Sequence, residues 1–337
     1  MVSTVPKTRP HFHRAFAALL LMPLFAAAMA PAQTETPAST QITPAQTAPP
    51  QEALGPSAAT PPGKTTHGLA VWDLPDRIMT AMLAAPPRKE EERYARLRHD
   101  FAAFGCTGDN LAELELPRDQ RHPILLCTLP GTTASRIVVT ARLTRYELFD
   151  GATDGWPDAA MLPMLYHALK AQPRRATFVF AELAGAHADM DFQNRLEAEG
   201  ATAPLALVSV EVLGFGPQGF SNLPATDLNP GVRSNSEALQ IEAWRLIHLR
   251  GVDTSRQAVI SQFYPGPQFQ PSLVRNGPKD IPRILLYSNP VVLPGRYPAF
   301  DLAAYHRNHD FLAFYLADID GKLNPQPPRQ QVSPPPN

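Results

Sequence analysis

Short apolar runs alternate with longer amphipathic stretches through most of the chain, and this alternation most constrains its fold. Strands with almost no polar interruption, each followed by a helix, are typical of parallel sheets that are covered on both faces. We therefore predict an α/β fold with a mixed, mostly parallel central sheet and helices on both faces. The expected strands are 136–143 (RIVVTARL), 176–182 (ATFVFAE), 205–213 (LALVSVEVL) and 281–288 (IPRILLYS), and the expected helices are 158–172, 186–199, 236–250 and 309–323.

A different pattern precedes this alternating region. Residues 74–84 and 87–104 have helical periodicity. Residues 111–116 and 124–129 are two apolar runs joined by a polar turn, which is typical of a β-hairpin. We expect the hairpin to add an antiparallel edge to the sheet.

The N-terminal 30 residues have the three parts of a secretory signal. Three basic residues lie within the first 14 positions, an apolar run covers 15–30, and Ala28-Met29-Ala30 is a small-x-small cleavage site. The alternative is an uncleaved membrane anchor. The apolar run is shorter than the about 20 residues that span a bilayer, and it contains Pro23. We predict a signal peptide, a periplasmic or secreted protein, and no membrane span in the mature chain.

Composition divides the rest of the chain. Residues 31–66 are rich in Pro, Thr, Ala and Gln, and residues 324–337 are rich in Pro, so both have too few large apolar side chains to fold. We predict a disordered linker and a disordered tail around one folded domain at 67–323. The formal net charge of the chain is −1, which argues against a nucleic-acid partner.

The two cysteines, Cys106 and Cys127, are too few for a disulfide scaffold or a four-thiolate zinc site. An exported chain permits a disulfide between them. Cys127 lies in an apolar strand, so a buried, unpaired thiol is the other interpretation. The sequence does not decide between the two.

In an open α/β sheet, ligands bind beyond the carboxyl ends of the strands. Here these ends are 142–154, 182–189, 211–215 and 289–309, and each contains ionisable residues. No GxSxG or P-loop motif is present, so a nucleophile elbow and a P-loop phosphate cradle have no support.

Six motifs occur in a fixed order: IVVTARL, GATDGW, TFVFAELAG, LVSVEVLG, IPRILLYS and YHRNHD. The series resembles the zinc-dependent aminopeptidases and glutaminyl cyclases of metallopeptidase family 28, over residues 74–322. The resemblance implies a zinc-exopeptidase-like, phosphorylase/hydrolase-like fold. It also implies a site of carboxylates and histidines that hold one or two zinc ions, with a glutamate as general base.

The family's site residues are only partly present in this chain. Where the family has a His-x-Asp pair after its first strand, this chain has Arg142 and Thr144. By the same resemblance, the bridging aspartate falls on Asp154, the tandem glutamates near Glu182-Leu183, and the next carboxylate on Glu211. The last histidine ligand falls on His306.

Arg142 is the most informative departure, because a guanidinium has no lone pair for a metal and stays protonated. Among Asp154 and Glu211 it would supply a fixed positive charge where a zinc ion would lie. Carboxylates buried without a cation are costly, so we expect Arg142 to be hydrogen-bonded to one of these two residues.

A single zinc on Asp154, Glu182 and His306 is the alternative, with Glu182 or Glu211 as the base and Trp156 lining a pocket. The cofactor is thus none or one zinc. Each residue also has an ordinary interpretation: Asp154 in a turn, Glu182 facing water, Glu211 in a salt bridge, Trp156 packed on the next helix, and His306 exposed near a helix start.

Three functions follow from these interpretations. The first is an exported pseudoenzyme with a peptidase fold that retains a cleft for a peptide or small molecule but no metal. The second is an active single-zinc aminopeptidase or glutaminyl cyclase-like enzyme that acts on peptide N-termini. The third is an interaction module of the cell envelope, tethered by its linker.

Overall fold

The computed structural model describes eleven segments of the chain. They are 63–66, 69–115, 122–143, 146–148, 151–153, 155–171, 173–183, 185–220, 230–249, 280–288 and 299–323. The predicted signal peptide, nearly all of the linker and the C-terminal tail lie outside these residues. In the described part no helix is long and apolar enough to cross a membrane.

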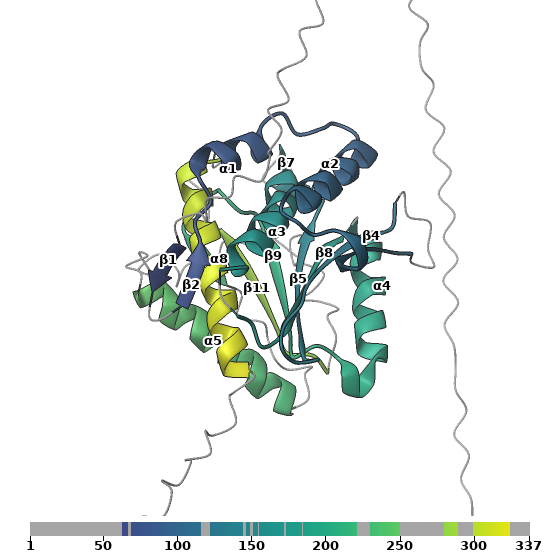
Figure 1. Cartoon of the computed structure of the whole chain (residues 1–337), viewed down its shortest axis with the longest axis vertical. Coiled ribbons are helices and arrows are strands. Elements are labelled where there is room, and N and C mark those ends of the chain that lie inside the picture. The colour runs from purple at the N-terminus through teal and green to yellow at the C-terminus, as the bar shows by residue number, and fades with distance from the viewer. Residues whose placement is uncertain are drawn as a thin grey trace, which may run out of the picture. The chain divides into compact units, whose positions relative to one another are not determined.

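The core of the fold is a seven-stranded mixed sheet in the order β10-β11-β9-β5-β8-β4-β3 (Figure 1). The four strands β11, β9, β5 and β8 run parallel, and antiparallel strands flank them on both sides. The bounds are β3 Leu111–Leu114, β4 Ile124–Leu129, β5 Arg136–Arg142, β8 Thr177–Leu183, β9 Ala206–Glu211, β10 Gln218–Phe220 and β11 Arg283–Ser288.

Helices cover both faces of this sheet, so the predicted fold class is confirmed. The sheet lies between α8 on one side and α4 on the other (Figure 1). A larger core on the α3 and α8 face contains Val139 and Phe178, and a smaller core on the α4 face contains Val138 and Leu207. The helices are α1 Asp76–Leu83, α2 Glu90–Ala103, α3 Trp156–Leu169, α4 Gly185–Ala198, α5 Pro230–Leu249 and α8 Leu302–Leu323.

The predicted hairpin is present, since β3 pairs antiparallel with β4 at one edge of the sheet. Other short strands were not predicted. They are β10 and two separate two-stranded sheets, β1 (Gly63–Thr66) with β2 (Leu69–Trp72) and β6 (Tyr146–Leu148) with β7 (Gly151–Thr153). β1 occupies the last four residues of the predicted linker.

The C-terminal helix begins seven residues before its predicted start at 309. The side chain of Asp301 accepts a hydrogen bond from the backbone N–H of Ala303 at 3.0 Å, which caps the helix at this earlier point. As a consequence His306 and His309 lie inside α8, and His309 is buried. The ordinary interpretation of His306, exposed near a helix start, is only partly right, because its side chain is 25% exposed and lies in the second turn of α8.

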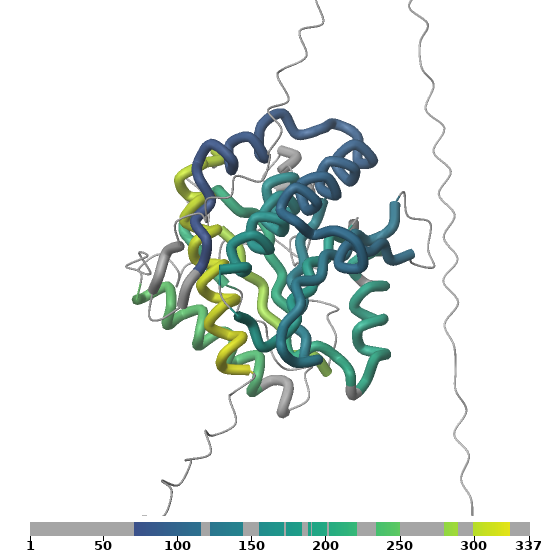
Figure 2. The backbone as a smooth tube through the Cα atoms, in the orientation of Figure 1, coloured from purple at the N-terminus to yellow at the C-terminus, as the bar shows by residue number. Residues whose placement is uncertain are grey.

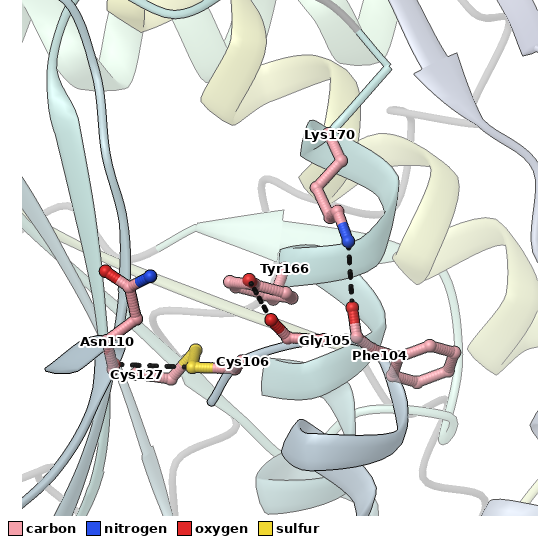
Figure 3. Close-up of a disulfide and its surroundings, with 7 residues drawn as sticks. All are labelled: Phe104, Gly105, Cys106, Asn110, Cys127, Tyr166 and Lys170. Atoms are coloured by element: carbon pink, nitrogen blue, oxygen red, sulfur yellow. Dashed lines mark hydrogen bonds between the residues drawn. A yellow bond between two sulfur atoms is a disulfide. The ribbon is translucent and has the colours of Figure 1, made fainter. Parts of the chain in front are cut away.

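A disulfide joins Cys106 to Cys127, which answers the question that the sequence left open (Figure 3). Both cysteines are buried. The bridge connects the segment that follows α2 to β4, the strand next to the edge strand β3.

Candidate functional site

The carboxyl ends of the parallel strands bring three charged side chains together. Arg142 ends β5, and its Nη2 donates a hydrogen bond to Asp189 Oδ2 of α4 at 2.7 Å. Its Nε lies 3.7 Å from Glu211 Oε1 at the end of β9. The expected pairing of Arg142 with Glu211 is thus present as an ion pair, although the closer partner is Asp189.

These carboxyl groups are largely removed from water. Asp189 is buried, and its other oxygen accepts a hydrogen bond from the Gln193 side chain one turn along α4. Burial raises the pKa of Asp189, and the Arg142 guanidinium opposes that rise. Burial raises the pKa of Glu211 to about 7, with Arg142 lowering it and Asp189 raising it. The cluster can therefore shed one negative charge near neutral pH by binding a proton.

The turn that follows Glu211 is fixed by side chains from three other elements. Val212 has a φ of 57°, which is unusual for a β-branched residue. Asp158 of α3 holds this conformation, because its carboxylate accepts hydrogen bonds from the backbone N–H groups of Val212 and Leu213 at 2.9 and 2.8 Å. Strained backbone of this kind is found where the surrounding structure over-determines it, often at functional sites.

Gly214 continues the same turn. Its N–H donates to the Ser288 hydroxyl at 2.9 Å and to Asn308 Oδ1 at 3.0 Å. Its φ is 87°, and a Cβ there would lie 2.3 Å from the Phe300 ring, so glycine is required at this position. The turn after β9 is thereby tied to α3, β11 and α8.

Glu182 lies on the opposite face of the sheet from Arg142. In the β5–β8 register Arg142 pairs with Leu183, and Glu182 pairs with Ala141. Since adjacent residues of a strand point to opposite faces, Glu182 points into the larger core, while Arg142 points toward α4. The single sheet therefore separates the two groups that the sequence placed in one site.

The neighbours of Glu182 come from the β3–β4 connection and from α2. Its Oε2 lies 3.9 Å from Nδ1 of His122, whose Nε2 is 3.3 Å from Glu90 Oε1. Glu182 has no exposed surface. Burial raises its pKa well above the ordinary value, and a hydrogen bond with the backbone of Leu125 opposes that rise. The interpretation in which Glu182 faces water is therefore wrong.

His306 has its own set of partners, near the N-terminal part of the domain. Its Nδ1 lies 2.6 Å from Asp76 Oδ1, and its Nε2 lies 3.8 Å from Asp73 Oδ1. Asp73, His306 and Asp310 form the one group in the described segments whose three ligand atoms lie within 4.8 Å of one another. Glu182 is not in this group, so the described contacts do not assemble the predicted zinc ligands.

The remaining predicted residues are placed as follows. Thr144 and Asp154 lie outside the described residues, so the zinc set that contains Asp154 stays a prediction. Trp156 is 1% exposed, and its Nε1 donates to the Met82 carbonyl at 2.9 Å. It therefore joins the start of α3 to α1, whereas its ordinary interpretation had it packed on the helix that follows.

The sequence did not assign Asp189, Asp158 or His122 to the site. Asp189 lies within a strand-end segment that was expected to bear the site, but its position at a helix start indicated only capping. His122 lies in a polar turn with no motif. Packing brings Asp189 to the site because α4 docks on the sheet, and it brings His122 near Glu182 because the end of the β3–β4 connection lies beside β8.

A zinc ion does not fit the described residues at the strand ends. The position nearest both carboxylates is held by the Arg142 guanidinium, which carries positive charge and has no lone pair to give. No histidine is part of this cluster among the residues that the structure describes.

Comparison with solved structures gives the fold an independent reference. A glutaminyl cyclase from Macrostomum lignano is 13% identical, with 73% of this chain and 89% of that chain aligned and a TM-score of 0.51. Also similar is the Fimbriiglobus ruber glutaminyl cyclase, at 11% identity, with 77% of this chain and 98% of that chain aligned and a TM-score of 0.47. The Legionella pneumophila LapA aminopeptidase is 11% identical, with 72% of this chain and 70% of that chain aligned and a TM-score of 0.46. The likeness to the Macrostomum lignano structure shows that this chain has the α/β fold of that glutaminyl cyclase, as the resemblance in the sequence predicted.

No protein-family model matches the sequence, and no curated protein matches it. The identities to the solved structures are too low to carry an activity from them to this chain. Its chemistry has to be argued from its own residues.

Proposed function

We propose that this chain is a non-catalytic relative of the zinc aminopeptidases and glutaminyl cyclases, in which an arginine has taken the place of a metal ion. The observation that carries the proposal is the double pairing of Arg142 with Asp189 and Glu211 at the carboxyl end of β5.

Charge balance explains why this cluster needs no metal. Two carboxylates in a dry site are costly without a cation, and Arg142 supplies one positive charge. The pKa of Glu211, raised to about 7 by burial, allows a proton to neutralise the remaining negative charge. The guanidinium and the proton together perform the electrostatic role of a divalent ion.

The same arrangement removes the catalytic groups of a zinc hydrolase. A guanidinium cannot polarise a carbonyl as a Lewis acid, nor can it lower the pKa of a bound water. Glu182 is enclosed in the core on the other face of the sheet, so it has no water to activate. What the site can still offer is a charged, hydrogen-bonding floor for a peptide or another small polar molecule.

We further propose that the chain is exported. Its first 30 residues have the pattern of a secretory signal, and the Cys106–Cys127 disulfide belongs to oxidising compartments. An exported domain of this kind, with no metal at its strand ends, acts by binding in the periplasm or outside the cell.

The test is zinc binding at the strand ends, in a background that keeps His306 but lacks the two carboxylates grouped with it. Zinc titrated into Asp73→Asn with Asp310→Asn by calorimetry should give no stoichiometric binding. Arg142→His with Thr144→Asp, added to that background, restores an imidazole and a carboxylate and should bring measurable zinc affinity. Arg142→Lys is the matched control, because it keeps the positive charge and should bring none.

Activity provides the second measurement. The wild-type chain, incubated with zinc, should neither hydrolyse aminoacyl p-nitroanilides nor cyclise N-terminal glutamine of a peptide. Hydrolysis or cyclisation that is lost in Glu211→Gln would overturn the proposal in favour of a single-zinc enzyme. So would tight zinc binding by Asp73→Asn with Asp310→Asn that is lost when Asp154→Ala is added.

A further inference from the structure

A second cluster of ligand-type side chains lies away from the strand ends, where the first strands of the domain meet its last helix. Asp73 follows β2, Asp76 begins α1, and His306 and Asp310 are one turn apart on α8. Because residues i and i+4 of a helix lie on the same face, His306 and Asp310 present their side chains together. The N-terminal segment and α8 run side by side in Figure 2.

We infer that Asp73, His306 and Asp310 form a binding site for a divalent transition-metal ion such as Zn²⁺, and that Asp76 positions the histidine. The inference does not depend on the function proposed above, because it uses none of the strand-end residues.

The orientation of the His306 ring supports this site. Its Nδ1 lies 2.6 Å from Asp76 Oδ1, so a carboxylate stands beside one ring nitrogen. Its Nε2, the other ring nitrogen, lies 3.8 Å from Asp73 Oδ1. Nε2 is enclosed and has no hydrogen bond in the described residues. A carboxylate on one imidazole nitrogen and an ion on the other is a recurrent arrangement in metal sites.

A second, independent observation comes from His309. This side chain is 1% exposed, and neither of its ring nitrogens has a hydrogen-bond partner in the described chain. Its Nδ1 faces Asp310, 3.5 Å from Oδ1. Buried polar groups without partners are rare, and a bound ion or water is a usual explanation. An ion on Asp310 with its coordinated water supplies such a partner beside His309.

The donor set selects the type of ion. One imidazole nitrogen and two carboxylate oxygens suit Zn²⁺ and its transition-metal neighbours, whereas Ca²⁺ prefers oxygen ligands alone. At zinc-ligand distances of about 2.0–2.2 Å, two ligand atoms of a tetrahedral site lie roughly 3.5 Å apart. The three ligand atoms here lie within 4.8 Å of one another, so small side-chain rotations close the site. Three protein ligands leave one tetrahedral position for water.

The position of this site predicts its consequence. It links β2 to α8, segments far apart in the sequence that pack against each other. An ion that binds the folded chain and not the unfolded chain stabilises it by mass action. We therefore expect zinc to raise the melting temperature of the protein.

The experiment is calorimetric titration of the metal-stripped full chain with ZnCl₂, and with CaCl₂ for comparison. One zinc per chain should bind, calcium should not, and the melting temperature should rise with zinc. His306→Gln and Asp310→Asn should each abolish binding. Asp76→Asn should weaken binding about 10- to 100-fold, because it releases the positioning contact. His248→Gln on α5 is the control for loss of a histidine, and should bind as the wild type does.

A spectroscopic measurement separates loss of the site from loss of the fold. Cobalt(II) bound at an N,O,O site of low symmetry should give visible absorption bands that shift in Asp76→Asn, while circular dichroism of the variants stays that of the wild type. Absence of zinc binding in the folded wild type would overturn the inference. Binding that survives both His306→Gln and Asp310→Asn, or that is lost in Arg142→Lys, would place the ion elsewhere and overturn it as well.

Discussion

At the scale of single residues, the strand-end cluster is an electrostatic compromise. Arg142 is shared between two carboxylates, and it is closer to Asp189 than to Glu211. The more weakly paired carboxylate is the one whose pKa rises to about 7. The proton on Glu211 is therefore part of the charge balance of this cluster, and its loss should lower the free energy of unfolding by a measurable amount.

We predict that Glu211 makes the folded chain less stable as pH rises. An acid whose folded pKa is raised from 4.5 to about 7 binds its proton more tightly in the folded chain than in the unfolded one. Its stabilising contribution is complete below about 4.5 and is lost as pH rises through about 7, at a cost of about 3 kcal/mol. The side chain of Glu211→Gln does not titrate. The free energy of unfolding of this variant minus that of the wild type should therefore increase as pH rises from about 4.5 to about 7.

Urea unfolding at several pH values measures this difference. Glu237→Gln, an exposed position on α5, controls for the loss of one negative charge. A stability difference between Glu211→Gln and wild type that stays constant from pH 4.5 to pH 8 would show that Glu211 is not held protonated by the fold.

At the scale of elements, the end of α2 shows how local sequence and packing cooperate. Gly105, just beyond the helix, takes a φ of 89°. The N–H of Cys106 donates to the Phe101 carbonyl, and the N–H of Gly105 donates to the Ala102 carbonyl. This is the hydrogen-bond pattern of a Schellman motif. Lys170 Nζ and the Tyr166 hydroxyl of α3 then donate to the carbonyls of Phe104 and Gly105 (Figure 3).

We predict that the disulfide stabilises this corner of the domain by about 3 kcal/mol. It closes a loop with a sequence separation of 21 residues, and the entropy that such a loop removes from the unfolded chain corresponds to that value. Cys106→Ala with Cys127→Ala should therefore unfold at lower urea than the oxidised wild type.

Reduced wild-type protein is the matched reference for this experiment. The double variant should respond to dithiothreitol not at all, and the wild type should fall to a stability near that of the variant. Equal urea midpoints for the oxidised wild type and the double variant would contradict a stabilising role.

At the scale of the whole molecule, the described domain is closed by contacts between its two ends. α8 packs on β2 and on α3, so residues near the N-terminal and C-terminal limits of the domain share one core. Asp320, near the end of α8, also accepts hydrogen bonds from the backbone N–H groups of Arg175 and Ala176 at the start of β8. The domain therefore requires its last helix to complete the sheet's larger core.

Export acts on the chain as a whole, and we predict that it removes residues 1–30 and oxidises both thiols. Expressed in a bacterium with a periplasm, the protein should be recovered there with Pro31 as its first residue. Its mass should be that of the mature chain less two hydrogens, as measured by mass spectrometry. Ala28→Lys with Ala30→Lys blocks the small-x-small site and is the control. Full-length, reduced protein in the cytoplasm would contradict the prediction.

Much of the architecture could be predicted from sequence, because hydrophobic periodicity reports local structure directly. The four apolar runs became β5, β8, β9 and β11, and the helices between them lie where the amphipathic stretches predicted. Boundaries were less certain where a cap decided them, as at Asp301, which starts α8 seven residues early. Short strands such as β10 carry too few residues to show a period.

The sequence by itself determined that Arg142 stands where the family resemblance predicts a histidine ligand, and no local conformation can make a guanidinium a metal ligand. Only the tertiary structure decided which charged groups meet. Strand register put Glu182 and Arg142 on opposite faces of one sheet, and the docking of α4 supplied Asp189 as the partner of Arg142. The reason is physical. The geometry of a strand fixes that successive side chains point to opposite faces of the sheet. Which helix covers each face is decided by the packing of segments far away in the chain.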